Sequence, residues 1–115
     1  MPQLILDYTT GITLDVPKTL LALHRILDGS GQFATSDIKS RARCHEHWLT
    51  GVEAGEGPFV HLQLLLLDGR DLATREALSQ ALLPVLQAHC QGPQGTQLCV
   101  EVHEMVRATY SKAML

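Results

Sequence analysis

The chain has 115 residues, of which 45% are hydrophobic and 18% charged, so it is long enough for one core and too apolar for a disordered tail. Nine Lys and Arg against twelve Asp and Glu give a formal net charge of -3, which argues against a protein that mainly coats nucleic acid, because neutralising phosphates needs clustered surplus cations. No apolar run approaches the ~20 residues that span a bilayer, and we expect one soluble domain over residues 1–115.

The first half of the chain predicts a strand, a helix and a second strand. Gln3–Thr9 is a short apolar run typical of a strand, and Asp15 is placed to cap a helix that has Pro17 in its first turn and ends near Gly29. The segment Ile38–Leu49 alternates and predicts a strand. One face of that strand is cationic, with Lys39, Arg41, Arg43 and His45.

The second half predicts the same order of elements. Phe59–Leu67 is an apolar strand, and Leu72–Cys90 has the periodicity of a helix, with Asp71 placed to cap it. Pro84 is expected to kink this helix. Gln97–Met105 alternates again and predicts the last strand.

These elements predict an α+β, two-layer fold made of two β-α-β units, residues 1–50 and 58–105, joined by a glycine-rich connection. Each crossover is long enough for a parallel connection, so the strands form one four-stranded sheet with both helices on one face. We expect leucine-rich strands such as Leu62–Leu67 to make the other face apolar. An oligomer would then bury that face.

The cysteines and the N-terminus favour a cytoplasmic protein. Cys44, Cys90 and Cys99 are odd in number and widely spaced, as reduced thiols often are. The N-terminus lacks the basic region and the long apolar segment of a secretion signal.

The most unusual candidate residue is Pro2, which directly precedes a predicted strand. Removal of Met1 would leave a secondary amine, and an α-amino group has a pKa of about 7.7 to 8.0, close to neutral. Nearby cations would lower that pKa further. Pro2 is therefore a candidate general base, although a proline after the start codon has no such role by itself.

Three basic residues at two places in the chain are candidates for holding an anion. Lys39 and Arg41 lie two residues apart, hence side by side on one strand face, where a carboxylate could bind; the alternative is a solvated face. Arg70 lies in a turn between a strand and a helix, where anions are favoured. The alternative for Arg70 is an ion pair with Asp68 or Asp71.

Taken together, these segments resemble the 5-carboxymethyl-2-hydroxymuconate isomerase family of the tautomerase superfamily. The matching pieces are Met1-Pro2, Ile38–Arg41, and Phe59–Leu62 leading to Gly69–Arg75. They occur in the family's order and spacing and span most of the chain. Lys39 stands where the family pattern has arginine, so that position offers the point charge of an ammonium group instead of a planar guanidinium.

The resemblance implies a tautomerase-like fold and a homotrimer that needs no metal and no organic cofactor. It implies conversion of the 2-hydroxy dienol of a small unsaturated dicarboxylate, such as 5-carboxymethyl-2-hydroxymuconate, to its 2-oxo tautomer in aromatic-compound catabolism such as homoprotocatechuate degradation. Pro2 would act as general base and then acid, and Arg70 would hold a carboxylate or stabilise charge on the 2-oxygen. Arg41 or Lys39 would bind the other carboxylate.

Two other functions stay open. The same site could carry another reaction of the superfamily, dehalogenation or decarboxylation, in which a protonated Pro2 acts as an acid. The chain could also be a non-catalytic oligomer that binds a small acid on the same scaffold. The pKa of Pro2 separates the first alternative from the tautomerase, and retained Met1 would favour the second.

Overall fold

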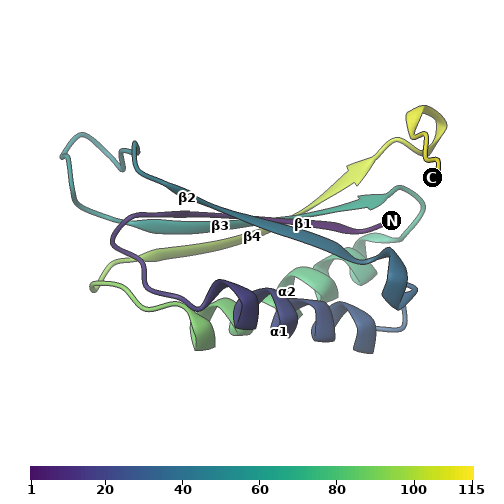
Figure 1. Cartoon of the computed structure of the whole chain (residues 1–115), viewed down its shortest axis with the longest axis horizontal. Coiled ribbons are helices and arrows are strands. Elements are labelled where there is room, and N and C mark those ends of the chain that lie inside the picture. Colours follow the sequence, from purple (N-terminus) through teal and green to yellow (C-terminus); the bar gives the residue numbers. More distant parts are fainter.

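The computed structural model covers residues 1–115 and shows a four-stranded sheet with two α-helices against one face (Figure 1). Both helices lie on the same side, as predicted. Neither has the length and apolar character that crossing a membrane requires. The elements in chain order are β1 (Gln3–Thr9), α1 (Val16–Gly29), β2 (Lys39–His45), β3 (Phe59–Leu67), α2 (Leu72–His89) and β4 (Gln97–Met105), with 3-10 turns at Thr35–Asp37 and Arg107–Thr109.

The strand order in the sheet is β2-β1-β3-β4. β1 pairs in parallel with β2, and β3 pairs in parallel with β4, each pair being connected through a helix. The two β-α-β units meet where β1 and β3 run antiparallel at the centre of the sheet. The α+β two-layer class predicted from the sequence is therefore confirmed.

Both helices begin at the predicted caps. A carboxylate oxygen of Asp15 accepts a hydrogen bond from the Lys18 backbone N–H at 3.1 Å, and Asp71 accepts one from Thr74 at 2.9 Å. α2 continues through Pro84 to His89, and the proline is exposed on the helix surface. At this exposed position the proline ring disturbs no packed side chain, although the helix still lacks one backbone N–H donor.

The core forms where every second residue of β3 meets the helices. Leu62, Leu64 and Leu66 are completely buried. From α2, the side chains of Leu82 and Leu86 join the same cluster, at helical spacing. Burial of this leucine layer holds the helices on the sheet and fixes which face of each strand points inward.

The uncovered face is less apolar than the leucine-rich strand predicted. Strand alternation sends Leu62, Leu64 and Leu66 under the helices, because the two faces of a strand take alternate residues. The opposite face is mixed: polar side chains predominate, and the apolar Ile5, Phe59, Leu65 and Leu67 lie among them. The polar residues are Gln3, Asp7, Lys39, Arg41, Arg43, His61, Gln63, Glu101 and His103. Leu65 and Leu67 therefore leave only a small apolar surface for an oligomer to bury.

The second strand is shorter than the predicted Ile38–Leu49. β2 lies at the sheet edge and pairs only with β1, so it ends at His45, opposite Thr9, where β1 ends. Trp48 lies in the loop that follows, and its indole N–H donates to the Thr10 hydroxyl at 2.8 Å. The alternating sequence pattern thus continues past His45, where β1 no longer offers a strand to pair with.

Leu62→Ala is expected to lower the free energy of unfolding by about 2 to 5 kcal/mol, because it leaves a cavity in a completely buried layer. The matched control is Leu49→Ala, since that side chain is 59% exposed. Urea or guanidinium unfolding followed by circular dichroism measures both variants. A loss as small in Leu62→Ala as in Leu49→Ala would contradict this account of the core.

Candidate active site

A cavity of about 190 Å³ lies where the first residues of the chain enter the sheet. Its walls come from four separate segments and contain Met1, Pro2, Gln32, Phe33, Ala34, Asp37, Leu67, Arg70 and Arg107. Pro2 itself is buried, and its carbonyl accepts a hydrogen bond from the Lys39 backbone N–H at 3.2 Å. The start of the chain is thus held by pairing with β2.

The sheet topology explains why these segments meet. β1 runs antiparallel to β3, so the start of β1 lies beside the end of β3 and the turn that carries Arg70. β4 runs parallel to β3 and ends at the same edge, with Met105 opposite Leu67. The segment after β4 therefore reaches the same cavity.

Arg70 is held by neutral groups only. Its Nε donates to the Gln32 side-chain oxygen at 3.1 Å, and its two terminal nitrogens donate to the carbonyls of Gln32 at 2.8 Å and Leu67 at 3.5 Å. The guanidinium carbon lies 4.6 Å from the centroid of the Phe33 ring, which adds a cation–π contact. No carboxylate neutralises this arginine, so its charge is free to attract an anion.

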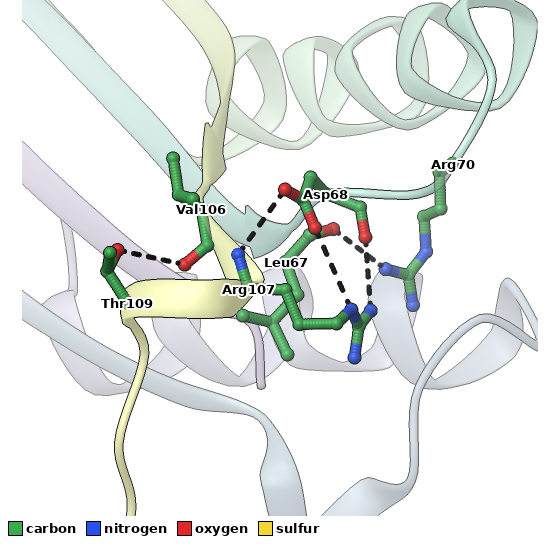
Figure 2. Close-up of polar contacts among 6 residues, drawn as sticks. All are labelled: Leu67, Asp68, Arg70, Val106, Arg107 and Thr109. Atoms are coloured by element: carbon green, nitrogen blue, oxygen red, sulfur yellow. Dashed lines mark hydrogen bonds and ion pairs between the residues drawn. The ribbon is translucent and has the colours of Figure 1, made fainter.

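Arg107 is a second guanidinium in the same cavity, and sequence reasoning missed it. Figure 2 shows its contacts with Asp68: the backbone N–H donates to the carboxylate at 3.3 Å, and a terminal nitrogen donates to the Asp68 carbonyl at 3.0 Å. Its Nε is 3.7 Å from the same carboxylate. The available signal was its position, because Arg107 follows β4 much as Arg70 follows the parallel strand β3.

The N-terminal amine lies in a positive environment. Burial lowers the pKa of the Met1 amine below its usual value; Asp37 opposes this shift, and the positive charges of Arg70, Lys39 and Lys112 add to it. Asp37 is itself partly neutralised by Lys112, whose Nζ is 3.5 Å from its carboxylate. Both burial and the surrounding cations favour an uncharged amine at this place.

The structure brings some of the predicted site residues together and separates others. Pro2 and Arg70 line one cavity. Lys39 is beside it: its Nζ donates to the Asp37 carbonyl at 3.3 Å, and its charge acts on the N-terminal amine, but its side chain is not part of the wall. Arg41 points onto the uncovered sheet face, where it donates to the Gln3 side chain at 2.8 Å and lines a different cavity.

Comparison with known protein families tests the resemblance drawn from the sequence. Residues 2–114 match the sequence model of the family described as 5-carboxymethyl-2-hydroxymuconate isomerase. The chain belongs to this isomerase family. The match begins at Pro2 and spans nearly the whole chain, so the tautomerase resemblance drawn from short motifs is confirmed.

Solved structures agree with this family assignment. A 5-carboxymethyl-2-hydroxymuconate isomerase from Deinococcus radiodurans R1 is 25% identical over 97% of this chain and 88% of its own, with a TM-score of 0.84. A fused 4-OT symmetric trimer is 20% identical, covers 96% of this chain and 91% of its own, and has a TM-score of 0.75. A malonate semialdehyde decarboxylase is 21% identical over 97% and 91% of the two chains, with a TM-score of 0.66.

The last two likenesses show the fold alone. No curated protein matches the chain. Family membership together with the isomerase structure identifies a tautomerase-type isomerase. In this isomerase, the cavity that holds Pro2 and two guanidinium groups is the candidate place for proton transfer.

Proposed function

We propose that this isomerase converts the 2-hydroxy dienol of a small unsaturated polycarboxylate to its 2-oxo tautomer, with Pro2 as the base after removal of Met1. The observation that carries the proposal is one cavity that contains Pro2, the uncompensated Arg70 guanidinium and a second arginine. A secondary amine there would face an anionic substrate held by cations. This is the arrangement that a proton transfer on a carboxylated dienol requires.

The substrate class follows from the family description and from the charges of the cavity. Muconate is a dienedioate, and the carboxymethyl group adds a third carboxylate. The compound 5-carboxymethyl-2-hydroxymuconate is therefore a tricarboxylate. The class is therefore widened from dicarboxylates to polycarboxylates. Arg70 and Arg107 supply positive charge to the wall of the cavity, and Phe33 and Leu67 supply apolar surface for a diene.

The reaction moves one proton and leaves the atom count unchanged. The Pro2 nitrogen takes the proton of the 2-hydroxyl group, and the oxygen lone pair forms the carbonyl. The electrons of the diene shift along the chain, and the protonated amine then delivers the proton to a distant carbon. Arg70 would stabilise negative charge on the 2-oxygen or hold the adjacent carboxylate.

Removal of Met1 is required for this role. While Met1 is attached, the Pro2 nitrogen is a tertiary amide, with neither a basic lone pair nor a proton to return. The family match supports the proposal because it includes Pro2. The malonate semialdehyde decarboxylase also supports it, since that protein is described together with a variant whose first residue, a proline, is replaced by alanine.

The lowered pKa at the N-terminus favours proton abstraction over the acid role. Dehalogenation or decarboxylation of the type considered above needs a protonated Pro2 near neutral pH. Burial lowers the pKa of the Met1 amine, Asp37 opposes this shift, and the Arg70 and Lys39 charges add to it; a Pro2 amine freed at this place would meet the same charges. A neutral amine is the form that works as a base, so the tautomerase reaction fits this environment better.

We also propose that the protein is a homotrimer. The fused 4-OT relative is a symmetric trimer, and this chain leaves both edge strands, β2 and β4, without a second pairing partner. Lys39 and Arg41 lie on the β2 edge strand, where a neighbouring chain would pack. In such a trimer, either side chain would be placed to bind a carboxylate from a site shared between subunits.

Mass spectrometry of the intact protein from its native host, combined with an ultraviolet assay of dienol loss, tests the proposed function. We expect a mass that lacks Met1 and turnover of 5-carboxymethyl-2-hydroxymuconate with kcat of about 1 to 10³ per second. Retained Met1 together with no turnover would overturn the tautomerase. If that protein still bound the acid, the outcome would establish the non-catalytic binding alternative.

A further inference from the structure

Two arginines from unconnected turns reach the same cavity because two parallel strands end together. Leu67 at the end of β3 pairs with Met105 at the end of β4. Arg70 follows the first of these residues, Arg107 follows the second, and both line the cavity that contains Pro2. Figure 2 shows the two guanidinium groups beside the Leu67–Asp68 segment.

Arg107 is fixed in place but keeps binding capacity. The Asp68 carboxylate accepts from the Arg107 backbone N–H at 3.3 Å, and the Asp68 N–H donates to the Met105 carbonyl at 3.0 Å. The turn that carries Arg107 is closed by Thr109, whose N–H and hydroxyl each donate to the Val106 carbonyl at 3.1 Å. These contacts order the backbone on both sides of the arginine before any ligand binds.

The donor inventory of Arg107 leaves one terminal nitrogen free. Its Nη2 donates to the Asp68 carbonyl at 3.0 Å, and its Nε is 3.7 Å from the Asp68 carboxylate. Nη1 makes no hydrogen bond or ion pair within the chain, and the side chain is 63% exposed. A planar guanidinium with free N–H groups is well suited to a carboxylate.

The charge balance of the cavity leaves one positive charge without a carboxylate partner. Arg70 has neutral acceptors only, so its charge is uncompensated. The acidic residue of the wall, Asp37, is engaged by Lys112. Asp68 is shared between the backbone and the side chain of Arg107 at the rim. One bound carboxylate would therefore balance Arg70, and a second would be held by the free N–H groups of Arg107.

We infer that Arg107 determines specificity by binding a second carboxylate of the substrate, distal to the one that Arg70 holds. The inference rests on the proposed tautomerase function and deepens it, because it adds, within a single chain, an anion contact to those suggested for Lys39 and Arg41. A substrate bound at both ends would have its reacting carbon fixed relative to Pro2. A monocarboxylate would use Arg70 alone.

Steady-state kinetics on dienols that differ in carboxylate number test this assignment. The substrates are 5-carboxymethyl-2-hydroxymuconate, 2-hydroxymuconate and the monocarboxylate 2-hydroxypenta-2,4-dienoate. Arg107→Gln is expected to raise KM for the two polycarboxylates by about 10- to 100-fold, because one charged hydrogen bond to the substrate is lost. The value of kcat should change much less. KM for the monocarboxylate should stay within about twofold, since that substrate makes no contact with Arg107.

Two further variants separate charge from structure. Arg107→Lys keeps the positive charge and should recover part of the KM loss, although both substitutions remove the planar contact with Asp68. Arg25→Gln is the matched control, because Arg25 is an exposed arginine of α1 outside this cavity. Equal effects on all three substrates, or no effect on the polycarboxylates, would overturn the assignment.

A binding measurement keeps this inference distinguishable from the proposed function. Calorimetric titration with tricarballylate, a saturated tricarboxylate, requires no turnover. If the wild-type protein turns over none of the dienols, the tautomerase proposal fails, yet weaker tricarballylate binding by Arg107→Gln than by Arg25→Gln would still support the anion contact. Equal binding by these two variants, or no binding by the wild type, would reject it.

Discussion

Blocking the Pro2 nitrogen is expected to lower kcat/KM by about 10²- to 10⁴-fold, the usual contribution of a general base. A short extension ahead of Pro2 achieves this, because it turns the amine into an amide and leaves every side chain of the cavity in place. Pro2→Ala is the companion variant. It keeps an N-terminal amine but loses the ring that fixes its direction, so we expect a smaller loss than for the blocked protein.

The comparison needs a check that the start of the sheet is intact. Pro2 is buried and its carbonyl pairs with Lys39, so thermal unfolding and circular dichroism should be recorded for both altered proteins. Loss of activity with unchanged unfolding would identify the nitrogen as the reacting group. Full activity in the blocked protein would show that another group takes the proton.

The pH profile gives an independent reading of the same amine. A base must be unprotonated, so kcat/KM rises as the pH increases through its pKa. Burial and the charges of Arg70 and Lys39 lower the pKa of the Met1 amine, and a Pro2 amine in this cavity would meet the same neighbours. The midpoint of the acidic limb is therefore expected below the usual α-amino range of about 7.7 to 8.0.

Arg70→Ala is expected to lower kcat/KM by about 10²- to 10³-fold, as loss of one donor to a developing oxyanion does in other enzymes. The Arg70 guanidinium has no carboxylate partner, so its removal leaves no carboxylate unpaired. The free energy of unfolding should therefore change little. The acidic limb of the pH profile should also move upward, because one of the charges that lower the amine pKa is gone. Steady-state kinetics across pH measures both effects.

Arg70→Lys refines this experiment. Lysine keeps the positive charge, so the acidic limb of the pH profile should stay near its wild-type position. The value of kcat/KM should fall, because lysine lacks the planar guanidinium that the carbonyls of Gln32 and Leu67 hold in place. Arg25→Ala serves as the control for removing an exposed arginine. An Arg70→Ala protein with wild-type kinetics would remove Arg70 from the site.

Local patterns in the sequence determined the elements and two of the site residues. Alternation and helical spacing depend on neighbours a few positions away, so Gln3–Thr9, Gln97–Met105 and both helix caps were predicted at the positions the structure shows. Pro2 stood out because it precedes a strand, and Arg70 because it follows one. Both line the candidate cavity.

Tertiary pairing decided the rest, because strand order and helix coverage depend on contacts between distant segments. Pairing of β3 with β4 brought Arg107 beside Arg70, and nothing local to Arg107 indicates that neighbour. The same pairing rules placed Arg41 on the open face, away from the cavity. Coverage by the helices left a mixed, mainly polar face exposed, since burying one set of alternate side chains turns the other set outward.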